Sequence, residues 1–214
     1  MVKVTLVKFA GYLVKYLYNK ENVLGEKYMQ TQLSDFVNLQ TLTEDLIIEL
    51  AYATPNNFTG QVVYDFTTAI ARRGSAQKLA EASKILKKQG YRIKVWDAYR
   101  PVSAQLKLFE VYPDPTFVAK PNPNFSHQKG VTFDVTLTDL AGKELVMPTA
   151  FDDFSEKAKR SSKHLWSPEA LANYNLLNDA MTQAGFIGYP NEWWDFRDSQ
   201  MDEYGPLSAN PNDY

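Results

Sequence analysis

The chain has 214 residues, of which 44% are hydrophobic, so it suffices for one folded domain of ordinary size, with or without an appendage. Its formal net charge of -2 and its pI near 5.8 leave no basic stripe to neutralise phosphates, which argues against a protein that wraps nucleic acid. The absence of cysteine excludes a disulfide framework, a thiolate zinc site, an iron–sulfur cluster and a cysteine nucleophile. Any metal must therefore be held by nitrogen and oxygen ligands.

The N-terminal stretch TLVKFAGYLVKYLY is apolar and rich in aromatic residues. Lysines interrupt it and no clear small-residue cleavage site follows, so we expect a folded or docking element. A polar break, YNKENVLGEKYMQTQ, separates it from the rest, and we expect residues 1–40 to be an N-terminal extension to a domain of residues 41–214. No segment approaches the roughly 20 apolar residues that span a bilayer, so we expect a soluble, cytoplasmic protein.

The first half of the expected domain begins with a short apolar run, 46–51, that is compatible with a strand, and with TPNNFTG, which is dense in turn formers. A helix is predicted from Ser75, its candidate N-cap, to Gln89, with Gly90 as its stop. Its buried face comprises Leu79, Ala82 and Leu86. The alternation in YRIKVWDAYRP predicts a strand that ends in a turn at 99–101, followed by a helix over about 102–111.

The second half contains the clearest patterns. Apolar and polar residues alternate from Val131 to Thr138, which predicts a strand with its apolar set buried and Asp134 on the polar face. Ser167 as N-cap, Pro168 and a stop at Gly185 predict a helix whose core stripe is Leu171, Tyr174, Leu177 and Met181. FIGYPNEWWDF reads as a last core segment. We predict a single-domain α+β fold with a mostly antiparallel sheet packed against helices.

The stretch SHQKGVTFDV carries a candidate metal site. His127 offers a ring nitrogen, Gly130 permits a tight turn, and Asp134 projects a carboxylate from the following strand. By itself the pair is equally compatible with a surface pair or a core hydrogen bond. The chain contains no HExxH, Walker loop, GxSxG or GxGxxG motif after a strand, so the chemistry must come from dispersed residues.

Two further segments contribute candidates. In EWWD, aromatic neighbours lower the local dielectric and raise the pKa of a carboxylate toward that of a general base; alternatively, Glu192 and Asp195 are solvated acids beside core tryptophans. In WDAYRP, Arg100 is either a functional cation or a structural arginine paired with Asp97.

The combination of YATPNNFTG, WDAYRP, SHQKGVTFDVTL, FDDF and EWWDF, in this order and spacing, resembles the D-alanyl-D-alanine dipeptidases of the vancomycin-resistance type. These are zinc peptidases related to bacterial DD-carboxypeptidases. The resemblance covers roughly residues 45–200 and implies that 41–214 is a metallopeptidase domain.

The family pattern S-x-H-x-x-G-x-x-x-D implies that His127 and Asp134 are zinc ligands. In this chain Phe125 and Ser126 directly precede the histidine, and Ser126 is taken as a substrate-binding candidate. The family's E-x-W-H implies a catalytic glutamate followed by a third ligand.

At those positions this chain has Glu192 and then Asp195, a departure at the metal itself. The arginine of the family's YRP turn, which stabilises the oxyanion, corresponds to Arg100. The aspartate that holds the substrate's free ammonium corresponds to Asp152, with Asp153 as a neighbour.

An aspartate at the third position has consequences. With His127, Asp134 and Asp195 the charge of a divalent ion is cancelled, which makes a weaker Lewis acid and loosens the preference for one Zn²⁺ per chain over Mn²⁺, Fe²⁺ or Co²⁺. His164 is the only other histidine and is an alternative source of nitrogen. Glu192 and Asp195 can both reach the ion only if their segment bends.

Three functions are consistent with these residues. The first is a metal-dependent dipeptidase in which Glu192 is the general base, Arg100 stabilises the oxyanion and D-alanyl-D-alanine is the substrate. The second is a catalytically silent or weakened homologue that binds a cell-wall peptide. The third is a carboxypeptidase for a related peptide. No nucleic-acid or membrane partner is expected.

Overall fold

The structure is a computed structural model that describes residues 3–9, 12–18, 35–115 and 118–214. The chain divides into two compact units, Met1–Asp35 and Phe36–Tyr214. In the first unit, β1 (Lys3–Phe9) pairs antiparallel with β2 (Tyr12–Tyr18). Most of the polar break that follows lies outside the described residues. The assignment of residues 1–40 as an extension and 41–214 as a metallopeptidase domain stays a prediction.

The second unit is built on a five-stranded sheet in the order β4-β6-β7-β9-β8. Its strands are β4 (Ile47–Ile48), β6 (Tyr91–Asp97), β7 (Thr132–Asp139), β8 (Phe186–Gly188) and β9 (Asp195–Asp198). β4 runs parallel to β6, and the other pairings are antiparallel. A second antiparallel pair joins β3 (Phe36–Asn38) to β5 (Ile70–Arg72). The predicted α+β class with a mostly antiparallel sheet is confirmed.

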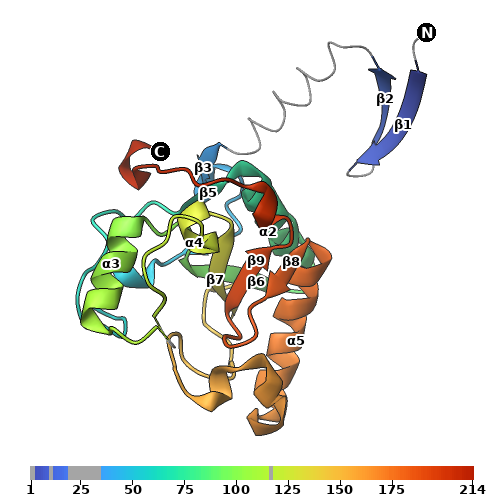
Figure 1. Ribbon diagram of the computed structural model, residues 1–214. Helices are drawn as coiled ribbons and strands as arrows, with labels where there is room; N and C mark the ends of the chain where they lie inside the picture. The colour runs from blue at the N-terminus through green and yellow to red at the C-terminus, as the bar shows by residue number, and fades with distance from the viewer. Residues whose placement is uncertain (1–2, 10–11, 19–34, 116–117) are drawn as a thin grey trace. The chain divides into compact units, whose positions relative to one another are not determined.

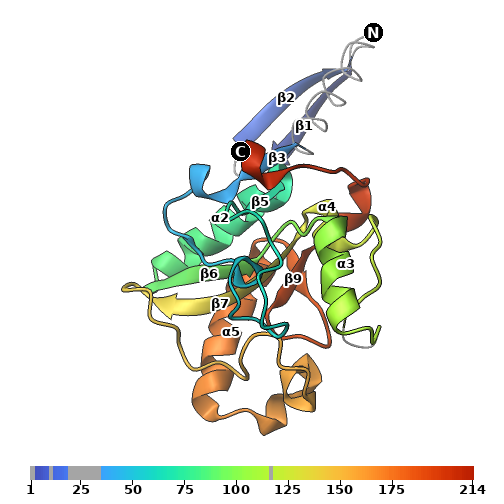
Figure 2. The ribbon, with the colours of Figure 1, turned by 90° about the vertical axis from the view of Figure 1, so that its left-hand side faces the viewer.

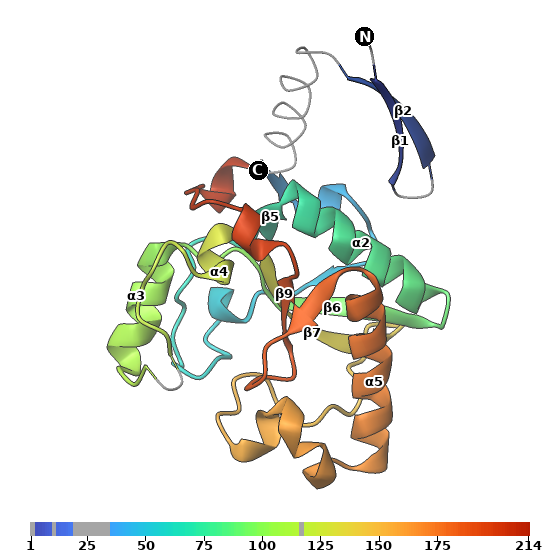
Figure 3. The ribbon, with the colours of Figure 1, turned by 45° about the vertical axis from the view of Figure 1, so that its right-hand side comes forward.

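Two long helices pack against the sheet and against each other. These are α2 (Arg73–Lys87), which contacts β6, and α5 (Pro168–Gln183), which contacts β7 and β8. Figures 1 and 3 show that α3 (Val102–Val111) lies on the other side of the sheet from them. The one-turn helix α4 (Ser126–Lys129) directly precedes β7, and Figure 2 shows it beside the top of α3.

Short 3₁₀ helices occupy several connections: Leu39–Thr41, Ala51–Ala53, Glu156–Ala158, Arg160–Leu165, Met201–Glu203 and Pro211–Asp213. In the described part of the chain, no helix has the length and apolar character needed to cross a membrane.

The observed helix starts confirm one predicted N-cap and contradict the other. The hydroxyl of Ser167 accepts a hydrogen bond from the Ala170 amide at 3.1 Å, as predicted for the start of α5. The predicted cap of α2 was wrong, because the helix begins at Arg73 and Ser75 lies inside it. Ser75 is buried, and its hydroxyl donates instead to Asp198 at 2.6 Å. A tertiary hydrogen bond thus explains a serine that the sequence pattern assigns to a cap.

The core surrounds β7, whose two faces are both buried. Phe133, Val135 and Leu137 form the expected apolar face and are fully buried. On the opposite, polar face, Thr132 and Thr136 flank Asp134 and are also fully buried. The sheet therefore carries Asp134 into the interior of the unit, where an uncompensated charge is costly.

Candidate metal centre and active site

Three carboxylates lie side by side across the middle of the sheet. Asp134 on β7 is the cross-strand neighbour of Asp97 at the end of β6 and of Asp195 at the start of β9. A register shift after Val95 brings Asp97 opposite Asp134, and such irregularities commonly re-aim side chains beside functional sites. All three carboxylates are buried. The strand register alone therefore concentrates negative charge at one place.

The backbone turn after α4 places the imidazole of His127 beside these carboxylates. Gly130 ends the helix with a φ of 73°, in the left-handed region that favours glycine. A Cβ at this position would lie 2.4 Å from Cε1 of Phe36, so a larger residue would displace the turn. The glycine in SHQKGVTFDV thus has the structural role that the sequence predicted.

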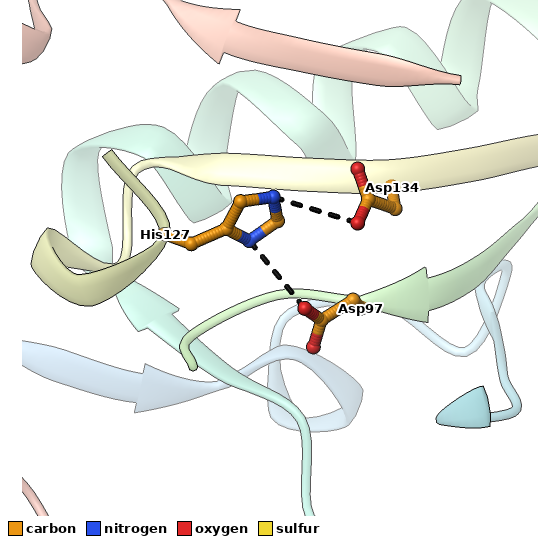
Figure 4. A group of neighbouring side chains, drawn as sticks. All are labelled: Asp97, His127 and Asp134. Atoms are coloured by element: carbon orange, nitrogen blue, oxygen red, sulfur yellow. Dashed lines mark ion pairs between the residues drawn. The ribbon is translucent and has the colours of Figure 1, made fainter. Parts of the chain in front are cut away.

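The orientation of His127 leaves one ring nitrogen available to a ligand. Its Nδ1 lies 2.9 Å from the carbonyl oxygen of Ala98, which can only accept, so Nδ1 donates. Nε2 lies 3.4 Å from Oδ2 of Asp134 and 3.8 Å from Oδ2 of Asp195. Figure 4 shows the ring between Asp97 and Asp134, with Nε2 facing Asp134.

These atoms fit a divalent cation. Ligand atoms 2.0–2.2 Å from a tetrahedral ion lie about 3.3–3.6 Å apart, close to both distances from Nε2 of His127. Carboxylate oxygens of Asp134, Glu192 and Asp195 also lie within 4.8 Å of one another. Oδ1 of Asp134 is buried with no hydrogen-bond partner among the described residues. A buried anion with an unpaired oxygen, next to an open imidazole nitrogen, is what a cation site requires.

A second group of possible ligands, Asp97 with His127 and Asp134, is less suitable. Oδ1 of Asp97 accepts from the Tyr64 hydroxyl at 2.6 Å, and Oδ2 accepts from Nε of Arg100 at 2.8 Å. Both of its oxygens are therefore already bonded. We assign Asp97 to positioning and leave His127, Asp134 and Asp195 as the residues that could hold a metal.

The crowding of the carboxylates shifts their pKa values. Burial raises the pKa of Asp134, while His127 acts in the opposite direction. Burial, followed by repulsion from Asp195 and Asp134, raises the pKa of Glu192 well above its usual value. Burial lowers the pKa of His127, but Asp134 and Asp97 more than offset this, so the net shift is upward. Additional positive charge at this place would relieve the repulsion.

Arg100 in the WDAYRP turn is both a structural arginine paired with Asp97 and a cation beside the candidate ligands. It pairs with Asp97, with NH2 2.7 Å from Oδ2, as expected of a structural arginine. The same NH2 lies 3.4 Å from Oδ2 of Asp134, and NH1 donates to Oε1 of Gln105 at 2.9 Å. The guanidinium is therefore held rigidly next to the candidate ligands, with its carbon 5.1 Å from the centre of the Tyr52 ring.

The segment that carries Glu192 and Asp195 does bend. The amide of Tyr189 donates to the carbonyl of Asp195 at 3.0 Å, which closes a loop between β8 and β9. Both carboxylates consequently approach Asp134. Trp193 and Trp194 are buried, Asp195 is buried and Glu192 is partly buried, so the interpretation as solvated acids is wrong.

Arg160 holds this loop in place, and no sequence pattern predicts this role. Its Nε donates to the carbonyls of Tyr189 and Glu192 at 2.9 and 3.0 Å. Its NH2 donates to the carbonyls of Trp193 and Asp195 at 2.8 and 2.9 Å. One side chain therefore binds carbonyls along the whole loop. KAKRSSKH reads as an ordinary polar segment, which is why this residue was missed.

Asp152 lies apart from the metal candidates, in a left-handed conformation with a φ of 55°. Its Oδ2 accepts from the Tyr52 hydroxyl at 2.9 Å. Burial, together with repulsion from Asp134, raises the pKa of Asp152 to about 7. The adjacent Asp153 instead accepts from the amide of Ser155 at 2.8 Å, a local turn contact.

A single cavity of about 610 Å³ connects these groups. Its lining includes the predicted site residues Arg100, Ser126, His127, Asp134, Asp152, Glu192 and Asp195. It also includes Tyr52 and Arg197, which the sequence did not single out. His164 is exposed and is not among the lining residues, so it does not supply the missing nitrogen.

Comparisons with known proteins agree on one family. The family model of peptidase M15, described as D-ala-D-ala dipeptidase, matches residues 32–208. The D-alanyl-D-alanine dipeptidase of Escherichia coli (strain K12) is 35% identical over 176 residues, which are 82% of this chain and 90% of that protein. Proteins of the same name from Enterococcus faecalis (strain ATCC 700802 / V583) and Enterococcus faecium are 31% and 30% identical, over 76% and 75% of this chain and 90% of each of them.

Proposed function

Because this chain belongs to the peptidase M15 family of D-ala-D-ala dipeptidases, we propose that it hydrolyses D-alanyl-D-alanine at a metal centre held by His127, Asp134 and Asp195. The observation that carries the proposal is the convergence of Nε2 of His127 with Oδ2 of Asp134 and of Asp195, at 3.4 and 3.8 Å. Glu192 and Asp152 line the same cavity, so a base and an ammonium site accompany the ligand set.

A divalent ion bound there, Zn²⁺ or alternatively Mn²⁺, Fe²⁺ or Co²⁺, would polarise the peptide carbonyl and acidify a water. Glu192 would take the proton of the attacking water as the water oxygen bonds to the carbonyl carbon of the peptide. The same carboxyl then passes the proton to the departing amine as the carbon–nitrogen bond breaks. Burial, the largest cause that raises the pKa of Glu192, favours this role, because a carboxylate withdrawn from water has a higher proton affinity.

Arg100 supports the negative charge that develops on the carbonyl oxygen. Its guanidinium is already oriented by Asp97 and Gln105, so little reorganisation is needed when the charge appears. Asp152 binds the free ammonium of the dipeptide, and Ser126 lies on the wall of the same cavity. An ammonium bound by a partly buried carboxylate would explain a preference for dipeptides, since an acylated amine would leave the carboxylate of Asp152 without a counter-charge.

The direct experiment incubates purified protein with D-alanyl-D-alanine and with Zn²⁺, Mn²⁺ or Co²⁺ in turn, and measures free D-alanine. We expect release that is abolished by a chelator. No release with any metal would contradict the proposal. An N-acylated dipeptide is the matched control, because a carboxypeptidase would cleave it and the proposed dipeptidase would not.

A catalytically silent homologue is the second candidate, and the carboxylate of Asp195 is the observation that favours it. A ligand set with two carboxylates makes a weaker Lewis acid. Calorimetric binding of D-alanyl-D-alanine without turnover would support this candidate. We expect Asp195→His to raise zinc affinity and activity; if its zinc affinity equals that of the parent, Asp195 does not contact the metal.

A further inference from the structure

Arg197 contacts the carboxylate of Asp195. The two residues are separated by one position on β9, so their side chains project from the same face of the strand. Nε of Arg197 donates to Oδ1 of Asp195 at 3.1 Å, and NH2 lies 3.4 Å from Oδ2. The side chain of Asp195 is 3% exposed and that of Arg197 is 28% exposed. The pair is therefore mostly withdrawn from water, where a charge-assisted hydrogen bond is stronger than at the surface.

The ring of Tyr189 holds the guanidinium in this position. The central carbon of Arg197 lies 3.8 Å from the centre of that ring, a close cation–π contact. Tyr189 is itself tied to the ligand strand, because its amide donates to the carbonyl of Asp195. Arg197, Tyr189 and Asp195 all line the cavity. The arginine is thus fixed by the strand and by the loop that together carry the candidate ligand.

The contact engages the two oxygens of Asp195 unequally. Oδ1 receives the shorter hydrogen bond from Arg197. Oδ2 is the atom that lies 3.8 Å from Nε2 of His127. A carboxylate held more closely through one oxygen presents the other in a fixed direction, which is how neighbouring groups orient metal ligands in proteins. Without the guanidinium, the short side chain could rotate away from His127.

The positive charge of Arg197 also offsets the negative charge of Asp195. Asp134 and Asp195 contribute two negative charges to the ligand set, and Arg100 is already shared between Asp134 and Asp97. Arg197 adds one positive charge next to Asp195. The combination of an anionic ligand and its paired guanidinium therefore has the net charge of a neutral ligand.

We propose that Arg197 is a positioning residue that makes Asp195 an effective third ligand, by directing Oδ2 toward His127 and by offsetting the charge of the carboxylate. This inference rests on the proposed function, because it requires that a metal is bound at His127, Asp134 and Asp195. It predicts that Arg197 and Asp195 act as a unit. Groups that orient metal ligands typically change metal affinity by about 10- to 100-fold, which sets the expected effect.

The test is a double-mutant cycle on metal affinity. The full-length parent, Arg197→Gln, Asp195→His and the double variant are stripped of metal, and the dissociation constant for Zn²⁺ is measured by competition with a chromophoric chelator. In the parent background, we expect Arg197→Gln to weaken zinc binding about 10- to 100-fold. In the Asp195→His background the same substitution should strengthen binding, because histidine offers no carboxylate and the guanidinium then repels the ion.

Lys159→Gln is the matched control. Lys159 lines the same cavity and carries the same charge, but it pairs with Glu156 rather than with a candidate ligand. Its side chain is 41% exposed, so its field is screened by water. We expect Lys159→Gln to change zinc affinity less than threefold in either background.

The outcomes separate the two proposals. A change of sign of the Arg197→Gln effect between backgrounds supports the inference. An equal effect in both backgrounds, or no effect in the parent, overturns it while the metal centre stands. If the parent binds no metal that depends on His127, the proposed function fails and the inference fails with it.

Discussion

The two halves of the candidate site are held in different ways. His127 and Asp134 are fixed by the backbone. The amide of Arg100 donates to the carbonyl of His127 at 3.2 Å, that of Arg72 donates to the carbonyl of Gly130 at 2.9 Å, and Asp134 lies in β7 between β6 and β9. Glu192 and Asp195 lie at the end of a loop whose carbonyls converge on the side chain of Arg160. The first half therefore depends on backbone geometry, and the second depends on one guanidinium in addition to backbone pairing.

The two kinds of support differ in the side-chain substitutions that they tolerate. A main-chain scaffold tolerates most side-chain substitutions, whereas a loop bound through one side chain changes when that side chain changes. Asp195, the proposed third ligand, lies in the second half.

Replacing the base should have the largest effect. Glu192→Gln removes the proton acceptor but keeps the size of the side chain, so we expect kcat to fall about 10²- to 10⁴-fold. Zinc affinity should stay within a few-fold, because the ligands of the first half are untouched. Glu156→Gln is the control, since Glu156 is an exposed residue of the cavity rim that pairs with Lys159. Retention of full activity by Glu192→Gln would remove this residue from the mechanism.

Replacing Arg160, which binds the carbonyls of the loop, should have the second-largest effect. In Arg160→Gln the carbonyls of the loop lose their charged donor, and we expect a loss of about 3 kcal/mol in unfolding free energy together with a lower kcat. Chemical denaturation and steady-state kinetics measure the two effects.

The matched control for that variant is Arg92→Gln, at the far end of β6. Arg92 also binds backbone carbonyls, those of Glu44 and Asp45 at 3.0 Å each. It should lose stability but keep its kcat. Equal losses of kcat in both variants would show that Arg160 contributes only general stability.

A smaller effect is expected at Gly130, in the half held by the backbone. Gly130→Ala combines a left-handed φ with a contact on the ring of Phe36, and should cost about 2 kcal/mol of stability and weaken zinc binding. Gly60→Ala is the control, because Gly60 has a similar φ of 65° with nothing within 4 Å of a new Cβ. Thermal and chemical unfolding compare the two. If both variants lose the same stability, the contact with Phe36 contributes nothing.

The smallest predicted effect, counted per pH unit, concerns Asp152 in the metal-free protein. Its pKa is raised from 3.8 to about 7, so between these values the folded protein holds a proton that the unfolded chain has released. Stability from this group therefore falls as pH rises through that window, by about 1 kcal/mol per pH unit, and is constant above it.

Asp152→Asn should lack this slope, and asparagine tolerates the left-handed backbone that Asp152 adopts. The measurement is the unfolding free energy of both proteins from pH 4 to pH 8 with a chelator present. Parallel curves for the two proteins would show that Asp152 ionises normally.

Sequence patterns predicted the fold class, the family and most of the elements around the first half. The period of 2 in β7 and the glycine of SHQKG are local signals, and they suffice because His127 and Asp134 lie only seven positions apart. The helix over 102–111 and the cap at Ser167 are likewise local, and both were correct.

The second half could not be predicted in this way. Arg160 is about thirty positions from the loop that it holds, and Tyr52 is 100 positions from Asp152, so no periodicity connects them. The bulge that aligns Asp97 with Asp134 is a property of strand pairing and has no sequence signature here. Where a side chain rather than the backbone supports the site, the interaction is therefore tertiary and leaves no local sequence pattern.

Gly188 shows how the support from Arg160 constrains a second position of the chain. A Cβ at this position would lie 2.0 Å from the central carbon of Arg160, so the bare backbone of β8 makes room for the guanidinium. A lineage that gains a side chain at Gly188 must expel the arginine and therefore release the loop of Glu192 and Asp195. The two positions should consequently be lost or kept together among relatives, and a change at a strand residue outside the cavity lining would act as a change in the site itself.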